Sequence, residues 1–341
     1  MSHVSTFMPN PEARRNELSA RILEMTTVQF PELALAVFAF QYDHNPLYRR
    51  FCDLTGRTTA TVTGWEEIPC LPIRFFRNYT IKTGEWEAEA VFSSSGTTGQ
   101  HTSYHHLRYL DWYRTLSRKG FEHFYGPLSD YTLFALLPAY LERTGSSLVF
   151  MADDFIQQTG KPESGFFLED TEALLWQLAI ARESGRRFIL LGVSFALLEL
   201  AERFSPDLTG GIVMETGGMK GRRKEITRQE LHGILTDGFH LKEIHSEYGM
   251  TELLSQGWSK GQGIYHPSPT LRIRCRDITD PFCLREWGRT GAVNVYDLAN
   301  LDTVSFIATD DLGKVYPDDT FEVLGRLDAS DIRGCNLLVD A

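Results

Sequence analysis

The sequence predicts an α/β protein, and three patterns along its 341 residues predict this class. The first 55 residues have the apolar spacing of helices, with a stop near Asn45-Pro46. Further on, short apolar runs alternate with helical patterns, as in parallel β-α units covered on both faces. From Leu271 onward the pattern is β-rich. We therefore expect two regions, residues 1–265 and 266–341, with the boundary near Tyr265.

The expected elements follow in chain order. After the N-terminal helices, residues 64–84 contain Pro69 and Pro72 and are expected to be an irregular connection. A short strand is expected over Glu89–Phe92, and a long amphipathic helix from about Tyr104 to Phe124. Further strands are expected at Leu133–Leu137, Phe188–Leu191, Ile212–Glu215, Leu271–Cys275, Ala292–Tyr296, Thr303–Ala308 and Phe321–Leu324, with helices at Thr171–Arg182, Phe195–Arg203 and Glu225–Leu235.

Charge and composition exclude several classes of partner. The formal net charge of −11 argues against nucleic acid or an anionic membrane surface, because both require a basic face. No apolar run is long enough for a membrane-spanning helix, and no signal peptide is visible near Met1. The number of cysteines is odd and there is no C-x-x-C pair, so we expect reduced thiols and a cytoplasmic location. The cysteines are Cys52, Cys70, Cys275, Cys283 and Cys335.

A segment rich in serine, threonine and glycine follows the first expected strand directly. Glycines allow backbone N–H groups to converge on one point and hydroxyls add donors, so the segment is suited to binding phosphate oxygens. It lacks the lysine of the nucleoside-triphosphatase loop, and an ordinary flexible turn is the alternative interpretation. Its residues are Ser93, Ser94, Ser95, Gly96, Thr97, Thr98 and Gly99.

Four segments, in the same order along the chain, resemble the motifs of adenylate-forming enzymes, the superfamily of acyl-CoA synthetases, peptide-synthetase adenylation domains and luciferases. Ser93–Gly99 resembles the phosphate-binding loop, and Ser246–Glu252 resembles the Y-G-x-T-E motif. Thr309–Gly313 is similar to T-G-D-L-G, and Gly325–Asp328 is similar to G-R-x-D. The resemblance implies an adenylation-domain fold that uses ATP and Mg²⁺ to join a carboxylate to the α-phosphate of ATP.

The resemblance also implies a role for each matched residue. Tyr248, followed by Gly249, would stack on adenine, and Thr251 would donate a hydrogen bond to the α-phosphate. Glu252 would hold Mg²⁺, which prefers hard oxygen ligands. The structural alternatives are that Tyr248 is a core residue and that Glu252 is an acidic residue at a helix N-terminus.

Further roles come from the same resemblance. Asp311 would accept hydrogen bonds from the ribose hydroxyls, although a turn residue is the alternative there. Arg326 would donate to ribose or phosphate, and Gly217-Gly218 would lie beside adenine. Asp310 stands where the family usually has glycine, so the backbone there is expected to differ from that of the family's motif.

The chain departs from most of the family after the last motif. Only thirteen residues follow Asp328, so we expect the small mobile lid domain and its catalytic lysine to be absent. A narrower resemblance is to the acyl-protein synthetase (LuxE-type) branch. It implies that a fatty acyl group passes from acyl-AMP to Cys335 and then to a reductase partner. Lys220 is a candidate to supply the positive charge of the absent lid lysine. The alternative is that Lys220 belongs to a solvated basic turn.

Several readings of the function stay open. The favoured hypothesis is a fatty-acyl adenylating ligase with an apolar acyl pocket drawn from Leu137–Tyr140 and Val213–Met219. The alternatives are an acyl- or aryl-CoA ligase of the phenylacetate type, a transferase that uses preformed acyl-AMP, and a degenerate nucleotide-binding subunit without catalysis. The pair Thr251/Glu252 argues against the last of these.

Overall fold

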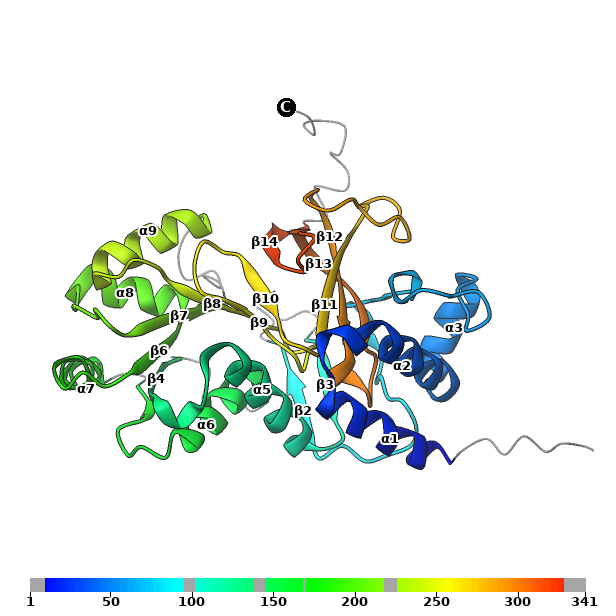
Figure 1. The fold of residues 1–341 in the computed structure, drawn as a ribbon, viewed down its shortest axis with the longest axis horizontal. Coiled ribbons are helices and arrows are strands. Elements are labelled where there is room, and N and C mark those ends of the chain that lie inside the picture. Colours follow the sequence, from blue (N-terminus) through cyan, green and yellow to red (C-terminus); the bar gives the residue numbers. More distant parts are fainter. Residues whose placement is uncertain (1–9, 95–101, 138–144, 168–169, 218–225, 328–341) are drawn as a thin grey trace, which may run out of the picture.

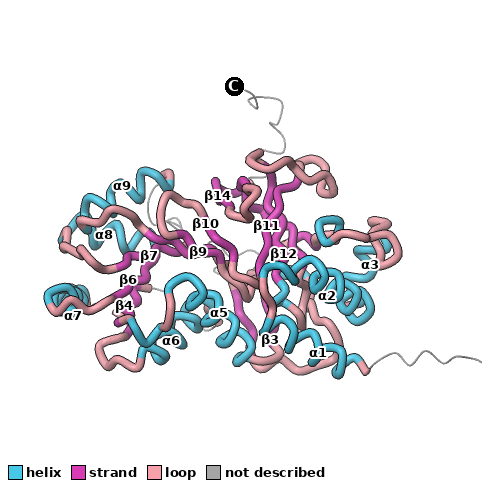
Figure 2. The backbone as a smooth tube through the Cα atoms, viewed as in Figure 1, coloured by secondary structure: helices cyan, strands magenta, loops and turns pink. Residues whose placement is uncertain are grey.

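The structure, a computed structural model, describes residues 10–94, 102–137, 145–167, 170–217 and 226–327. Within these residues one large mixed sheet runs through the molecule in the order β11-β12-β13-β14-β10-β9-β8-β7-β6-β4-β5, and β1 pairs with β13. Figure 2 shows these strands as the centre of the molecule, with helices outside them. The predicted α/β class is confirmed.

Three N-terminal helices pack beside the antiparallel end of this sheet (Figure 1). Asn10 and Asn45 accept a backbone N–H at the start of the first and third helix, and a proline follows each of them in the first turn. Their bounds are α1 (Pro11–Glu24), α2 (Phe30–His44) and α3 (Pro46–Leu54), followed by β1 (Leu71–Pro72) and α4 (Phe75–Asn78).

The other half of the sheet is parallel and is covered on both faces. Every residue of β6 is buried, as expected for a parallel strand between two helical layers. Helices α5 and α6 cover one face, and α8 and α9 cover the other (Figure 1). The elements are α5 (Leu110–Tyr125), β4 (Thr132–Leu136), α6 (Ser147–Thr159), β5 (Gly165–Phe166), α7 (Thr171–Glu183), β6 (Phe188–Val193), α8 (Ser194–Phe204), β7 (Ile212–Thr216), α9 (Arg228–Phe239) and β8 (His245–Tyr248).

The C-terminal strands are antiparallel, as the β-rich pattern predicts. They are β9 (Gly257–Ser259), β10 (Tyr265–Pro267), β11 (Leu271–Arg276), β12 (Gly291–Asp297), β13 (Phe306–Val315) and β14 (Phe321–Arg326). Tyr265 of β10 pairs with Ser259 of β9 and with Phe321 of β14, so hydrogen bonding continues across the expected boundary. The division into two domains stays a prediction.

One expected helix begins later than predicted. Tyr104–Leu107 forms β3, which pairs antiparallel with β2 (Ala90–Ser93), and α5 begins only at Leu110. The serine- and glycine-rich segment therefore connects the two strands of a hairpin, not a strand and a helix. The sequence did not reveal this because the partner of Tyr104–Leu107 lies more than ten residues upstream. In the described part of the chain, no helix is long and apolar enough to cross a membrane.

Candidate active site

The matched motifs meet where the parallel strands β7 and β8 end. Thr216, the last residue of β7, is the register partner of Glu247 in β8, so Gly217 and Tyr248 lie level with each other. Gly217 has φ +74, a backbone conformation that suits glycine, and its carbonyl oxygen accepts a hydrogen bond from Ser194 Oγ at 2.9 Å. Ligands in open α/β sheets bind at such carboxyl ends.

Tyr248, Asp311 and Arg326 form one hydrogen-bonded cluster. The Tyr248 hydroxyl donates to Asp311 Oδ2 at 2.9 Å, and Arg326 Nε lies 3.4 Å from Asp311 Oδ1. Burial raises the pKa of Asp311, while Arg326 and the hydrogen bond from Tyr248 lower it. The Tyr248 ring packs edge-on against Tyr265 and Phe321. The cluster therefore brings together three residues matched far apart in the sequence.

The substitution of Asp310 for the family's glycine leaves this cluster intact. Arg74 Nε lies 3.2 Å from Asp310 Oδ2, whereas Asp311 pairs with Tyr248 and Arg326. Asp310 and Asp311 are consecutive residues of β13, where side chains alternate between the two faces. Asp310 therefore points away from the cluster.

The Thr251–Glu252 segment is held through its backbone. His105 Nδ1 hydrogen bonds with the Thr251 carbonyl oxygen at 2.9 Å, and Asn300 Nδ2 donates to the Glu252 carbonyl oxygen at 2.8 Å. Burial lowers the pKa of His105 to about 4, so the ring is neutral at pH 7 and donates from Nδ1. Its Nε2 then accepts from Thr303 Oγ1 at 3.1 Å.

The buried Glu252 side chain lies close to both the hairpin and the Asp311 cluster. Burial raises the pKa of its carboxyl, whereas a hydrogen bond from Ser103 and the charges of Arg326 and Arg77 lower it. Arg326 thus lies within electrostatic reach of Glu252 as well as beside Asp311. Both carboxyls therefore interact with the same guanidinium.

The base of the serine-rich segment adjoins Glu252. Ser103 N donates to Ser94 Oγ at 2.9 Å, and Ser94 N donates to the Ser103 carbonyl oxygen at 3.0 Å. Ser93, at the end of β2, donates its N–H to the carbonyl oxygen of Gly145 at 2.8 Å. Several predicted residues lie outside the described part of the chain: Ser95, Gly96, Thr97, Thr98, Gly99, Gly218, Lys220 and Cys335.

The described residues contain no group of three or more His, Cys, Asp or Glu side chains placed to hold a metal. A single buried carboxylate such as Glu252 still fits Mg²⁺, because this ion keeps several waters and is usually shared with substrate phosphates. The predicted acyl pocket is described only in part. Leu137, Val213 and Met214 are buried in the core.

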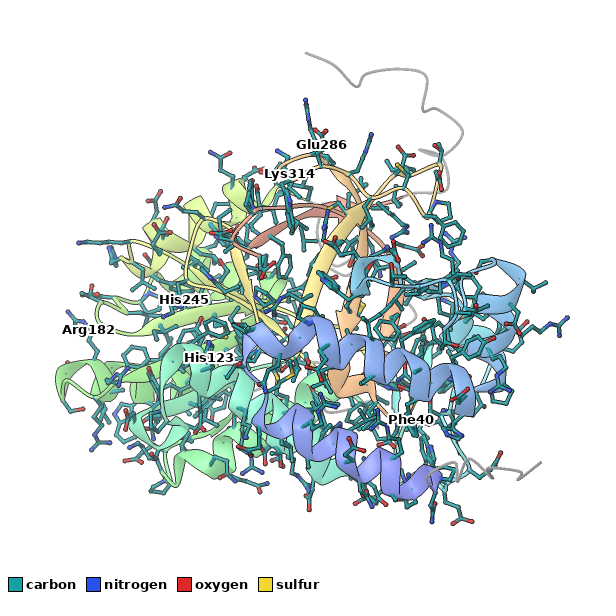
Figure 3. All side chains as sticks on the ribbon, turned by 45° about the vertical axis from the view of Figure 1, so that its right-hand side comes forward. Phe40, His123, Arg182, His245, Glu286 and Lys314 are labelled. Carbon is teal, nitrogen blue, oxygen red and sulfur yellow. The ribbon has the colours of Figure 1, made fainter. Side chains whose placement is uncertain are left out.

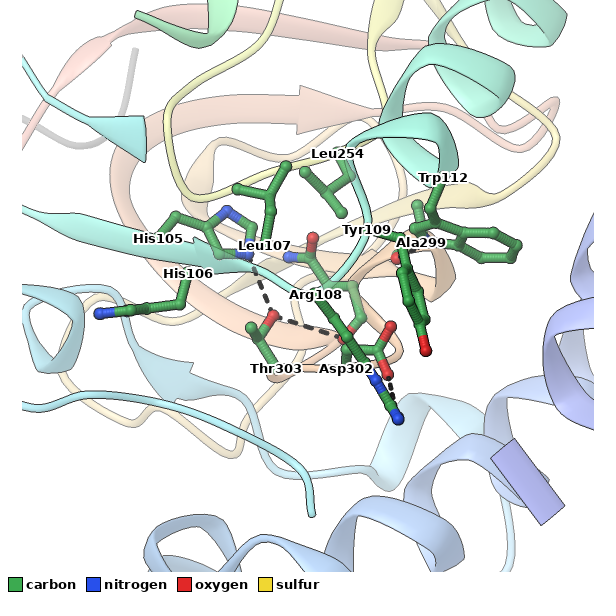
Figure 4. A pocket seen from close by; sticks show the side chains of 11 residues that line it. His105, His106, Leu107, Arg108, Tyr109, Trp112, Leu254, Ala299, Asp302 and Thr303 are labelled. Carbon is green, nitrogen blue, oxygen red and sulfur yellow. Dashed lines mark hydrogen bonds and ion pairs between the residues drawn. The ribbon is translucent and has the colours of Figure 1, made fainter. Parts of the chain in front are cut away.

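A small pocket is lined by β3 and the residues that follow it, including His105, Arg108 and Trp112, and by residues 299–303 (Figure 4). Some of its polar side chains are paired with one another, whereas His106 Nδ1 and Asn300 Oδ1 are buried without a hydrogen-bond partner. His105 bonds to Thr303, and Arg108 Nη1 lies 3.6 Å from Asp302 Oδ1. We interpret this pocket as part of the support for the Thr251–Glu252 segment.

Sequence reasoning missed several buried polar residues around the site. His105 falls within the helix expected from Tyr104, whereas it lies in β3, is 1% exposed and contacts Thr251. Glu247, which immediately precedes Tyr248, is buried and accepts a hydrogen bond from Thr216. Glu215 in β7 is also buried and accepts a hydrogen bond from Ser194. The only signal was a glutamate inside each of two otherwise buried strands.

No protein-family model matches the chain, and no curated protein matches it. Among solved structures it is similar to ATP-bound MatB from Rhodopseudomonas palustris, with 17% identity and a TM-score of 0.51, over 69% of this chain and 47% of that chain. It is also similar to 2-hydroxyisobutyryl-CoA ligase in an open conformation with 2-HIB-AMP and CoA, with 13% identity and a TM-score of 0.62. That match covers 91% of this chain and 72% of the ligase.

A second state of that ligase, the postadenylation complex with R3-HIB-AMP, is matched with a TM-score of 0.63 at 13% identity, over 91% and 70% of the two chains. The chain spans about half the length of MatB (47%). At such identities the similarity shows the fold alone. The chain has the adenylation-domain fold of these ligases, with its α/β region and β-rich C-terminal strands, as the sequence motifs predict.

Proposed function

We propose that this protein activates a carboxylic acid by adenylation, using ATP and Mg²⁺ to form acyl-AMP and pyrophosphate. The observation that carries the proposal is the Asp311 cluster beside the buried Glu252, in a fold shared with ligases solved with ATP or acyl-AMP. A nucleotide-binding subunit without catalysis would have no use for a buried carboxylate at this place.

The chain's own residues would bind and orient the two reactants. Asp311 would accept the ribose hydroxyls, and Arg326 would donate to ribose or phosphate oxygens as a fixed fork of donors. Thr251 would donate to the α-phosphate, and Glu252 would hold Mg²⁺. The bound ion would neutralise the charge that develops on the phosphate oxygens. His105 and Asn300 fix the backbone of Thr251 and Glu252, so these side chains need little reorganisation.

The acyl acceptor is the finer part of the proposal. The sequence resemblance supports a fatty or other carboxylic acid, transfer of its acyl group to Cys335, and delivery to a reductase partner. In that step the thiolate sulfur attacks the acyl carbonyl carbon, the carbon–oxygen bond to AMP breaks, and AMP leaves with the electron pair.

Acid-dependent exchange of labelled pyrophosphate into ATP tests the adenylation. We expect exchange with the wild-type protein and a loss of about a hundredfold or more in Glu252→Gln, because the Mg²⁺ ligand is weakened. Glu322→Gln, a control on β14, should exchange normally. Absence of exchange with every acid tested, in folded protein that binds ATP, would favour the noncatalytic alternative.

Intact-protein mass spectrometry tests the acceptor. Incubation with ATP and a fatty acid should add one acyl group to the wild type and none to Cys335→Ser, while Cys283→Ser stays labelled and both variants keep pyrophosphate exchange. Acyl-CoA formation when coenzyme A is added would instead support the CoA-ligase alternative, which the CoA-bound neighbour favours. Undiminished labelling of Cys335→Ser would exclude the carrier role.

A further inference from the structure

Strand β13 bulges away from β12 at the segment that contains Asp311. The register pairing skips from Ala308 to Leu312 on β13 while it advances by only two residues on β12, so Val293 stands opposite three residues of β13. On the other side of β13 the pairing with β14 continues, and Asp311 is the register partner of Arg326. A bulge of this kind leaves backbone polar groups without a partner in the ladder.

Arg276, the last residue of β11, reaches this bulge across β12. Its Nη1 donates to the carbonyl oxygen of Val293 at 2.7 Å and to Asn294 Oδ1 at 2.9 Å, and its Nη2 donates to the carbonyl oxygen of Thr309 at 2.7 Å. One guanidinium therefore connects the two strands where their ladder is interrupted. The planar fork of donors suits this role, because it binds two carbonyl oxygens in one fixed geometry.

Thr309 connects this contact to Asp311. The Thr309 hydroxyl donates to the Val293 carbonyl oxygen at 3.0 Å, and the Asp311 N–H donates to the same hydroxyl oxygen at 3.2 Å. Asp311 itself has no register partner in β12. On the β12 side, its backbone is therefore held through Thr309, which Arg276 holds in turn.

Arg276 differs in its partners from the other two arginines on its face of β11. Arg272 and Arg274 stand at alternate positions before it, are buried, and pair with Asp319 and Glu66 respectively. In the described part of the chain, the hydrogen-bond acceptors of Arg276 are two carbonyl oxygens and one amide oxygen, with no carboxylate. An ion pair does not account for this guanidinium. The interrupted ladder does, because buried carbonyl oxygens without a ladder partner need donors.

We propose that Arg276 is a positioning residue for nucleotide binding, which holds the bulge of β13 in the geometry that aims the Asp311 carboxyl at the ribose hydroxyls. This inference rests on the proposed adenylation, in which Asp311 accepts those hydroxyls. Arg276 lies outside every segment that resembles a family motif, and it acts through Thr309 without touching the nucleotide.

Calorimetric binding of AMP and of 2′,3′-dideoxy-AMP tests the inference. The wild type should bind AMP about tenfold more tightly, because only AMP has the hydroxyls that Asp311 accepts. Arg276→Met keeps an unbranched side chain but removes the donors, so this ratio should fall toward one, through weaker binding of AMP alone. Arg276→Lys, which still donates to a carbonyl oxygen, should restore part of the preference.

Pyrophosphate exchange gives a second measure of the same effect. Arg276→Met should raise the KM for ATP and leave kcat nearly unchanged, because a ribose contact is the same in the ground state and the transition state. In an Asp311→Asn background, where the contact is already weakened, adding Arg276→Met should change AMP affinity by less than about twofold.

Arg274→Met is the matched control, because Arg274 is buried on the same face of β11 and pairs with Glu66. Thermal unfolding should show that this variant loses stability too, but the ratio of AMP to dideoxy-AMP affinity should stay that of the wild type. If Arg276→Met does not fold, Thr309→Val takes its place in the comparison, since it removes the hydroxyl that accepts from the Asp311 N–H.

An unchanged ratio in the folded variant overturns this inference. An equal loss in Arg274→Met also overturns it, because the effect would then come from a general loosening of the sheet, and so does a wild type without the ribose preference. Absence of pyrophosphate exchange with every acid, in wild-type protein that keeps the preference, overturns the proposed adenylation instead. The ratio in Arg276→Met would then still decide whether Arg276 positions the nucleotide site.

Discussion

Asp311 is the single side chain on which nucleotide binding should depend most. It is 7% exposed and accepts hydrogen bonds from Tyr248 and Arg326, so its oxygens are already aimed and partly desolvated. Asp311→Asn keeps the shape and removes the charge. We expect the dissociation constant of AMP to rise about tenfold. Isothermal titration calorimetry measures it.

The adjacent aspartate supplies the control for this prediction. Asp310→Asn changes the same charge one residue away, but Asp310 pairs with the exposed Arg74. AMP affinity should stay within about twofold of the wild type, since exposed ion pairs contribute little. Equal losses in both variants would mean that net charge, not the Asp311 cluster, governs binding.

For single residues, the sequence indicated those that belong to a recognisable motif. It missed those whose role depends only on which residues they contact in the fold. Tyr248, Asp311 and Arg326 were found because their spacing in order resembles a family. His105 and Glu247 were not, since a buried histidine or glutamate in one sequence does not indicate which residues it contacts. Only the pairing of β7 with β8, and of β2 with β3, reveals what they touch.

Strand β8 links the site to helix α5 through His245. Tyr125 Oη lies 3.1 Å from His245 Nδ1, and the ring lies in the half of the molecule built from the parallel strands (Figure 3). Burial, and then the charge of Lys260, lower the pKa of His245 from 6.5 to about 4. The folded state therefore binds fewer protons than the unfolded chain between these two pH values.

Because the folded state binds fewer protons than the unfolded chain, its stability should fall as the pH falls. The contribution of His245 is complete above pH 6.5 and is lost as the pH falls toward about 4. The free energy of unfolding of the wild type, relative to His245→Gln, should fall by about 2 kcal/mol across that window. Urea unfolding at several pH values measures it. His123→Gln, at an exposed position on α5, is the control, and an equal change there would contradict the assignment to His245.

The elements themselves were predictable to different degrees. Long patterns such as α7 and α8 and fully apolar strands such as β6 lie where the sequence indicates them, because local periodicity determines them. Helix α6 and the short strands β9 and β10 were missed. Each of these strands has only three residues and depends on its neighbours in the sheet. Strand β9 pairs with β8 and β10, and β10 pairs with β9 and β14.

Over the whole molecule, a buried ion pair joins helix α1 to the C-terminal half of the chain. Arg15 Nε and Nη2 donate to Asp302 Oδ1 and Oδ2 at 2.9 and 2.6 Å, across 287 positions of sequence. Both residues are less than 10% exposed, and Arg108 Nη1 lies 3.6 Å from the same carboxyl. Helical patterns predicted α1 but gave no sign of where it docks.

This ion pair makes the docking of α1 testable. Arg15→Met keeps an unbranched side chain beside Tyr109 and Trp112 but leaves the buried Asp302 with Arg108 alone. We expect a loss of about 3 kcal/mol in the free energy of unfolding, because a buried carboxylate without its bidentate partner is strongly destabilising. Adding Asp302→Leu should recover part of this loss, as the uncompensated charge is removed. Arg14→Met, which removes only the pair with Glu17 on the helix surface, should cost less than about 0.5 kcal/mol in the same urea titration. If Arg15→Met cost no more than Arg14→Met, the helix would be held by its apolar face and not by the ion pair.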